Sequence, residues 1–202
     1  LPPNTRRTDA LDTAQIAGWW AGTEQLSNRT ASVYLRALLL TGARREEMAA
    51  LRWQDVDFRW RKLTIADKVE MTRTIPLTPY LAQLLATLPR VGPYVFASTG
   101  KAGRIVDARA SHDQVLEHAQ VKHLTFHGLR RTFIRQGRNI APLGVPAQMA
   151  GHTPSAVADG YAILPMDELR PHAERVEAHI LSLAGVQFDA QAEPGALRVV
   201  AG

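Results

Sequence analysis

The sequence contains no cysteine, which excludes disulfide bonds and thiolate chemistry and fits a reducing compartment. It also contains no apolar run near the ~18 residues that a membrane-spanning helix needs, and no phosphate-binding motif of the GxxxxGK[ST] type. Hydrophobic residues make up 46% of the 202 residues and charged residues 21%, close to the average of globular domains. We therefore expect one folded domain with a substantial core.

Acidic residues are missing from one long stretch of the chain. Between Val121 and His152 there is no Asp or Glu, whereas five basic residues lie there: Lys122, Arg130, Arg131, Arg135 and Arg138. The formal net charge is +5, and most of the 24 basic residues are arginines. Guanidinium groups match phosphate oxygens in pairs, so this charge favours a polyanionic partner. An ordinary basic surface is the alternative explanation.

Apolar periodicity, capping residues and turn signals predict a mainly α chain with a small three-stranded antiparallel sheet. Asp9 or Asp12 is expected to cap the first helix. Three β-forming segments predict the sheet, at 56–59, 62–66 and 72–77, and Pro76 should end its third strand. Helices are expected at 14–22, 30–41, 45–51, 79–88, 111–120, 127–137, 145–150, 155–161 and 166–184.

The same signals divide the chain into three parts. Residues 1–8 are interpreted as a linker and residues 9–184 as the folded domain. Residues 185–202 are rich in Gly, Ala and Pro, so we expect a C-terminal tail that is mobile or depends on a partner.

Two arginines are candidate anion-binding residues. Arg44 closes a Thr-Gly-Ala-Arg sequence, and Arg130 closes a His-Gly-Leu-Arg sequence that begins at His127. Residues three apart share one helix face, so His127 and Arg130 can reach one phosphate together. Each guanidinium donates paired charge-assisted hydrogen bonds that a lysine cannot match. Taken singly, each arginine is explained equally well as a solvated charge, and His127 as a local helix cap.

Three further residues suggest chemistry at a phosphate. His152 follows Gly151, and Tyr161 comes nine residues later. A tyrosine has an ordinary pKa of about 10 and is only ~0.1% phenolate at neutral pH, so a nucleophilic Tyr161 needs a base or nearby cations. Lys68 lies on the predicted hairpin eight residues before Pro76, where a lysine can protonate a leaving alkoxide. The alternatives are a helix-boundary histidine, a core tyrosine and a solvated lysine.

Taken in this order, the six residues resemble the catalytic set of the tyrosine recombinases, the phage integrase family. The resemblance covers about residues 7–184 and implies the catalytic-domain fold of that family. It also implies cleavage and rejoining of DNA strands through a 3′-phosphotyrosine, with no metal, nucleotide or other cofactor. His112, His118 and His123 have spacings that suit no common zinc site.

The resemblance assigns a role to each residue. Arg44 and Arg130 would bind the scissile phosphate, His127 would assist proton transfer, and His152 would hydrogen-bond the phosphate. The remaining roles fall to Tyr161 as the nucleophile, Lys68 as the general acid for the leaving 5′ oxygen, and Glu47 and Asp55 as structural acids that orient the first arginine or hold the helix–strand corner.

The implied function is that of a site-specific recombinase, an integrase of a prophage or mobile element. Its partners would be double-stranded DNA, further copies of itself in a tetramer on DNA and accessory DNA-bending proteins, in the cytoplasm at the nucleoid and not at a membrane. Family members place an N-terminal DNA-binding domain before this one, so we expect an excised catalytic domain with weak, salt-sensitive DNA binding. The alternatives are a chromosome-dimer resolvase, a type IB topoisomerase-like enzyme and a non-catalytic DNA-binding regulator on the same scaffold.

Overall fold

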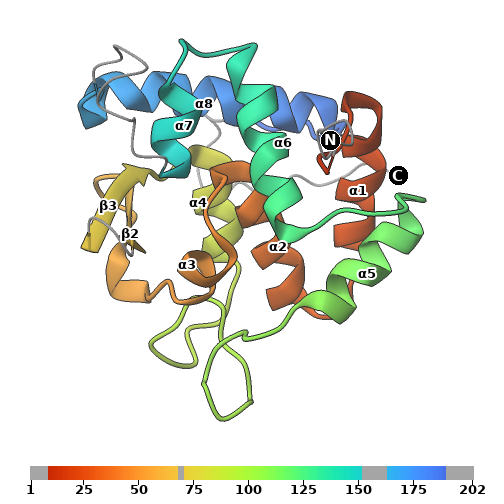
Figure 1. Ribbon diagram of the computed structural model, residues 1–202. Coiled ribbons are helices and arrows are strands. Elements are labelled where there is room, and N and C mark those ends of the chain that lie inside the picture. Colours follow the sequence, from red (N-terminus) through yellow and green to blue (C-terminus); the bar gives the residue numbers. More distant parts are fainter. Residues whose placement is uncertain (1–8, 68–70, 152–162, 190–202) are drawn as a thin grey trace, which may run out of the picture.

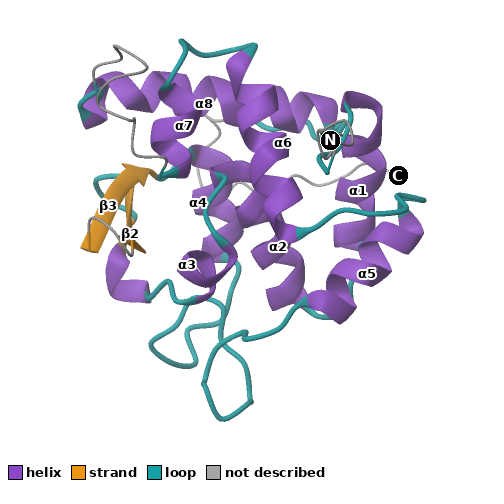
Figure 2. Cartoon of the chain, in the orientation of Figure 1, coloured by secondary structure: helices purple, strands orange, loops and turns teal. Residues whose placement is uncertain are grey.

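The computed structural model describes residues 9–67, 71–151 and 163–189, and the structural statements below concern these residues. Helices dominate the molecule, and a small sheet lies at one side (Figure 1; Figure 2). No helix in the described part of the chain is long and apolar enough to cross a membrane. The elements follow in the order α1 (Thr13–Glu24), α2 (Arg29–Thr41), α3 (Arg45–Ala49), the 3-10 turn η1 (Trp53–Asp55), β1 (Val56–Asp57), β2 (Lys62–Asp67), β3 (Met71–Pro76), α4 (Pro79–Ala86), α5 (Arg109–His118), α6 (Phe126–Arg138), α7 (Val145–Ala150) and α8 (Met166–Leu183).

Helix α2 is the centre of the core. Its apolar stripe of Leu35, Leu38 and Leu39 is fully buried, and helices α1, α3, α4, α5 and α6 pack around it. The side chain of Asn28 caps its start by accepting a hydrogen bond from the Ala31 N–H at 3.0 Å. Gly42 ends the helix in the left-handed region, at φ 63°.

The sheet has the strand order β1-β2-β3, and both neighbouring pairs are antiparallel. Leu63, Ile65 and Ile75 are buried and attach the sheet to the helices. Strand β1 is shorter than expected and ends at Asp57, because the Asp57 carboxylate accepts a hydrogen bond from the Trp60 N–H at 2.8 Å and the chain turns there. Pro76 ends β3, as predicted.

The two candidate N-terminal caps have different functions in the fold. Asp12 is the N-cap of α1, where it forms a capping box with Gln15. Asp9 instead crosses to the start of α6, where its carboxylate accepts hydrogen bonds from the N–H and hydroxyl of Thr125, at 2.9 and 2.5 Å. The segment before α1 is thereby fixed to the helix that carries His127 and Arg130.

The mainly α class with a three-stranded antiparallel sheet is confirmed. Most described helices begin and end within two residues of the expected positions, and α7 has the expected bounds. Between α4 and α5 the described chain forms no further helix or strand, only two isolated bridges, Arg52 to Tyr94 and Ala97 to Arg104. The helix expected at 155–161 lies outside the described residues.

Candidate active site

Arg44 lies at the corner between α2 and α3. Gly42 makes this corner, and a Cβ atom at this position would lie 2.5 Å from Cδ1 of Phe133 on α6. Arg44 is the N-cap of α3, and its backbone N–H donates to Oε2 of Glu47 at 2.9 Å. Its side chain is 45% exposed and donates from Nη1 to Oε1 of Glu47 at 2.5 Å. The corner therefore holds the guanidinium at the surface while anchoring one edge of it.

Arg130 projects from α6 toward the same corner and is only 2% exposed. Its Nη1 donates to the carbonyl oxygen of Gly42 at 2.9 Å and also to the carbonyl oxygen of Ala150. The side chain of Thr125 starts α6 by accepting a hydrogen bond from the Gly128 N–H at 3.0 Å. Because burying an isolated charge is costly, these carbonyl contacts fix the position of the Arg130 guanidinium.

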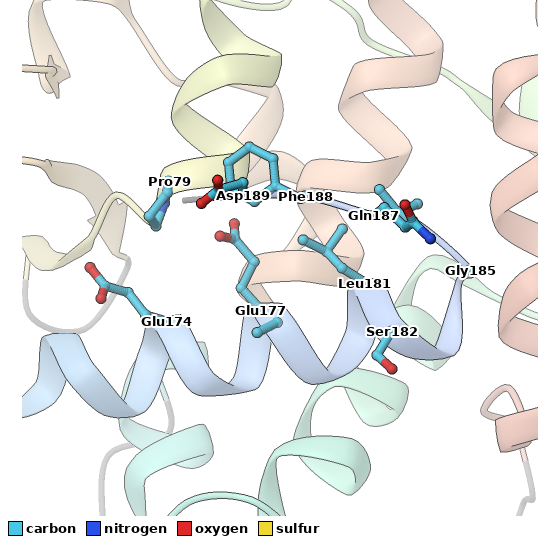
Figure 3. A pocket seen from close by; sticks show the side chains of 11 residues that line it. Pro79, Glu174, Glu177, Leu181, Ser182, Gly185, Gln187, Phe188 and Asp189 are labelled. Atoms are coloured by element: carbon cyan, nitrogen blue, oxygen red, sulfur yellow. The ribbon is translucent and has the colours of Figure 1, made fainter. Parts of the chain in front are cut away.

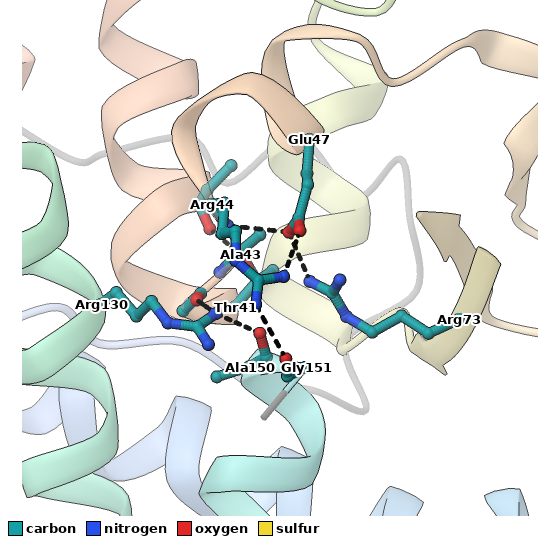
Figure 4. A network of polar contacts seen from close by, with 10 residues as sticks. Thr41, Ala43, Arg44, Glu47, Arg73, Arg130, Ala150 and Gly151 are labelled. Carbon is teal, nitrogen blue, oxygen red and sulfur yellow. Dashed lines mark hydrogen bonds and ion pairs between the residues drawn. The ribbon is translucent and has the colours of Figure 1, made fainter. Parts of the chain in front are cut away.

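The two predicted arginines converge on the end of α7. Arg44 donates from Nη2 to the carbonyl oxygen of Gly151 at 3.2 Å, and Arg130 donates to the preceding carbonyl, that of Ala150 (Figure 4). His152 follows Gly151 directly in the sequence. Arg44 and Gly151 thus lie in contact although they are 107 residues apart in the sequence.

His127 lies in the first turn of α6 and is exposed. Thr125 caps this helix, so the alternative reading of His127 as the cap is wrong. Partial burial lowers the pKa of the imidazole, and the positive charges of Arg131 and Arg130 lower it further against the opposing effect of Asp9. A His127 with this environment is mainly neutral at pH 7 and able to accept a proton.

Three of the predicted site residues lie outside the described residues: Lys68, His152 and Tyr161. The strands that flank Lys68, β2 and β3, pair as a hairpin up to Asp67 and Met71. His152 comes directly after the Gly151 turn. Their roles remain predictions.

Arg73 was not singled out from the sequence. Its Nη2 donates to Oε2 of Glu47 at 2.8 Å, and both side chains are 8% exposed. Gly151 has a φ of 76°, and a Cβ atom there would lie 2.6 Å from Cζ of Arg73, so the guanidinium packs directly on the turn. The alternation of strand residues contained the signal, because Arg73 lies two residues before buried Ile75 and shares its face.

Glu47 joins Arg44 to Arg73, and Arg130 meets Arg44 at the end of α7. We define the arginine cluster as Arg44, Arg73 and Arg130 with Glu47. Burial raises the pKa of the Glu47 carboxyl, but hydrogen bonds from Arg73 and Arg44 outweigh this effect and hold the pKa below its ordinary value. Glu47 is therefore ionised at neutral pH. Three guanidinium groups and one carboxylate give the arginine cluster a net charge of +2, which suits a phosphate group.

Outside the arginine cluster, further candidate features of the described chain are metal-binding groups, the buried His112 and a cavity beside α8. No group of three His, Cys, Asp or Glu side chains in the described ranges is arranged to hold a metal. His112 is buried beside Phe126, with ring centroids 4.8 Å apart, and not at a cluster of histidines. A cavity of about 700 Å³ lies between α8 and the segment 185–189, with Glu177 in its wall (Figure 3).

Comparisons of the sequence with known proteins point to one family. The sequence model of the phage integrase family matches residues 10–166. Prophage integrase IntF of Escherichia coli (strain K12) is 42% identical over 191 residues, which cover 90% of this chain and 41% of IntF. This chain thus spans less than half of that relative.

Solved structures share the fold at low sequence identity. The integrase from mycobacterium phage Brujita superposes with a TM-score of 0.63 at 16% identity, covering 89% of this chain and 65% of that one. A lambda integrase tetramer bound to a Holliday junction gives 0.59 at 16% identity, covering 77% of this chain and 50% of that one. The expected fold is confirmed, and the chain belongs to the phage integrase family.

Proposed function

We propose that this chain is the catalytic domain of a site-specific DNA recombinase, an integrase of a prophage or mobile element, that cuts and rejoins DNA strands. One observation carries the proposal. Arg44 and Arg130 come from different helices and meet at the carbonyls of Ala150 and Gly151, immediately before His152. Residues 1–8 would then be a linker, 9–184 the catalytic domain and 185–202 a tail.

The proposed reaction is a transesterification at phosphorus. The phenolic oxygen of Tyr161 bonds to the scissile phosphorus while the bond from phosphorus to the 5′ oxygen breaks, giving a 3′-phosphotyrosine. Neutral His127 takes the phenolic proton, and Lys68 gives a proton to the leaving 5′ oxygen. Attack by the 5′-hydroxyl of a partner strand reverses these steps. The phosphodiester bond energy is retained in the intermediate, so no nucleotide is consumed.

The arginine cluster supplies electrostatic stabilisation in this mechanism. Charge on the non-bridging oxygens grows during the displacement, and Arg44 and Arg130 are already held in place by their carbonyl contacts. Preorganised donors of this kind are worth roughly 2.7–4 kcal/mol each in transition-state stabilisation. His152 would add a hydrogen bond to the same phosphate.

The proposed partners follow from the same reaction. We propose that double-stranded DNA binds over the arginine cluster, and that the natural protein forms a tetramer on DNA, as the lambda integrase of known structure does on a Holliday junction. Accessory DNA-bending proteins and a location at the nucleoid in the cytoplasm belong to the same proposal.

The test uses the natural protein that carries this sequence and a nicked DNA containing its recombination junction, found by sequencing around the gene. The nick lets the short cleaved fragment diffuse away, so the covalent intermediate accumulates. We expect a protein–DNA band that survives SDS and forms in EDTA, and no band with Tyr161→Phe. Specific DNA binding without any band would instead indicate a regulator, and relaxation of DNA lacking the junction a topoisomerase-like enzyme.

A further inference from the structure

We propose that Arg73 is a positioning residue of the active site, which acts through Glu47 to leave Arg44 available for the scissile phosphate. This inference rests on the proposed function.

Two arginines from distant elements share one carboxylate. Glu47 receives Nη1 of Arg44 on Oε1 at 2.5 Å, and Nη2 of Arg73 on Oε2 at 2.8 Å (Figure 4). Arg44 comes from the helical corner, and Arg73 comes from β3, where it lies opposite Ile65. The carboxylate thus lies between the two guanidinium groups and orients one edge of each.

The two arginines differ in exposure. The Arg44 side chain is 45% exposed, whereas that of Arg73 is 8% exposed and packs on the Gly151 turn. Only Arg44 is therefore placed to meet a ligand from solvent. Arg73 is enclosed beside Glu47, where its charge acts on that carboxylate.

The consequence is electrostatic. A single carboxylate paired with Arg44 alone would cancel most of the positive charge that the guanidinium presents to a phosphate. With Arg73 on its second oxygen, Glu47 orients Arg44 while its charge is balanced by another residue. Because low local dielectric strengthens such interactions, removing Arg73 should weaken the attraction of Arg44 for an anion without removing Arg44.

The test compares Arg73→Met, which keeps much of the side-chain length, with Arg73→Lys, which keeps the charge. Thr74→Ala is the matched control, because Thr74 is the exposed neighbour on the same strand. Covalent-complex formation is timed on two nicked DNAs. One has an ordinary scissile phosphate, and the other has a methylphosphonate, in which a methyl group replaces one non-bridging oxygen and removes its charge.

On ordinary DNA we expect Arg73→Met to react roughly tenfold or more slowly than the wild type, whereas Arg73→Lys recovers most of the rate and Thr74→Ala matches the wild type. On the methylphosphonate, the Arg73→Met and wild-type rates should agree within about threefold, because the neutral group no longer draws on the charge of Arg44. Thermal melting shows whether each variant is folded.

The outcomes separate the two proposals. A wild-type rate for Arg73→Met on ordinary DNA, or an equal defect on both DNAs, would overturn the role of Arg73 while leaving the proposed function intact. An Arg73→Lys variant that melts normally but reacts no faster than Arg73→Met would also overturn it. If the wild type forms no covalent complex on ordinary DNA, the proposed function fails, and this inference fails with it.

Discussion

Glu47 orients two arginines of the cluster, because its carboxylate receives Arg44 and Arg73 as well as the Arg44 backbone N–H. Its neighbour Glu46 is chemically identical but 54% exposed, and pairs with Arg45 at the surface. Two neighbouring glutamates on the five-residue helix α3 therefore differ in function: Glu47 is buried and orients arginines, whereas Glu46 is solvated.

Replacement of Glu47 tests this difference. Glu47→Gln should lower the free energy of unfolding by about 3 kcal/mol, because it leaves two guanidinium groups without their shared counter-charge. Glu46→Gln should change it by less than about 1 kcal/mol, as expected of an exposed pair. Urea unfolding at pH 7 measures both, and equal effects would contradict the account.

His112 gives a prediction about pH. Burial lowers the pKa of its imidazole to about 4, from the ordinary 6.5. The unfolded chain therefore binds a proton at higher pH than the folded one, and stability falls as the pH drops from 6.5 toward 4. The shift corresponds to roughly 3 kcal/mol of unfolding free energy over that range.

The measurement is the slope of unfolding free energy against pH. His112→Gln should flatten the slope between pH 6.5 and 4, whereas His118→Gln, at an exposed position on the same helix, should leave it as in the wild type. A wild-type slope in His112→Gln would show that other groups cause the acid sensitivity.

At the scale of elements, residues at the starts of two helices donate hydrogen bonds to carboxylates from distant parts of the chain. Asp9 binds Thr125 at the start of α6. Glu177, on α8, accepts hydrogen bonds from the N–H groups of Tyr80 and Leu81 in the first turn of α4, both at 2.9 Å. Glu177 thus takes the place of a local cap at α4, whereas Asp9 binds the residue that caps α6, and each acid holds two distant segments together.

Glu177 tests the second case. Glu177→Ala should lower the free energy of unfolding by about 2–3 kcal/mol, because it leaves buried N–H groups of α4 unsatisfied. Glu174 lies three residues earlier on α8, in the wall of the same cavity (Figure 3), and Glu174→Ala is the control, with a change within about 0.5 kcal/mol. Equal losses in the two variants would mean that Glu177 contributes nothing specific to α4.

These distant contacts mark the limit of prediction from sequence. The described helices and strands followed from local patterns, such as the apolar periodicity of the helices and the Pro76 stop. The convergence of Arg44 and Arg130 was expected only through the family resemblance. That Asp9 would bind α6, or that Arg73 would share Glu47, depends on contacts between segments far apart in the sequence, which local periodicity does not encode.

At the scale of the whole molecule, acidic residues near the N-terminal end of the described chain partly neutralise the basic stretch around α6. Arg131 pairs with Asp9 at 3.3 Å, and Arg135 pairs with Asp12 at 3.2 Å. Arg130 is occupied with backbone carbonyls. The five basic residues between 121 and 152 therefore overstate the positive field that α6 offers to DNA.

Salt dependence tests this reading. The isolated domain should bind duplex DNA weakly, with a slope of log affinity against log salt between about −2 and −5, as expected for a few phosphate contacts. Fluorescence anisotropy across a salt series measures the slope. Tight binding that persists at high salt would contradict the prediction.

Under the proposed function, Tyr161 carries the DNA during strand exchange. Peptide mapping of the covalent complex by mass spectrometry tests it most directly. Tyr161 is the only tyrosine on the tryptic peptide that follows Arg138, because the other three lie at 34, 80 and 94. After nuclease and trypsin digestion, we predict a nucleotide phosphate adduct on that peptide, with fragment ions that place it on Tyr161. An adduct on any other residue would contradict the account.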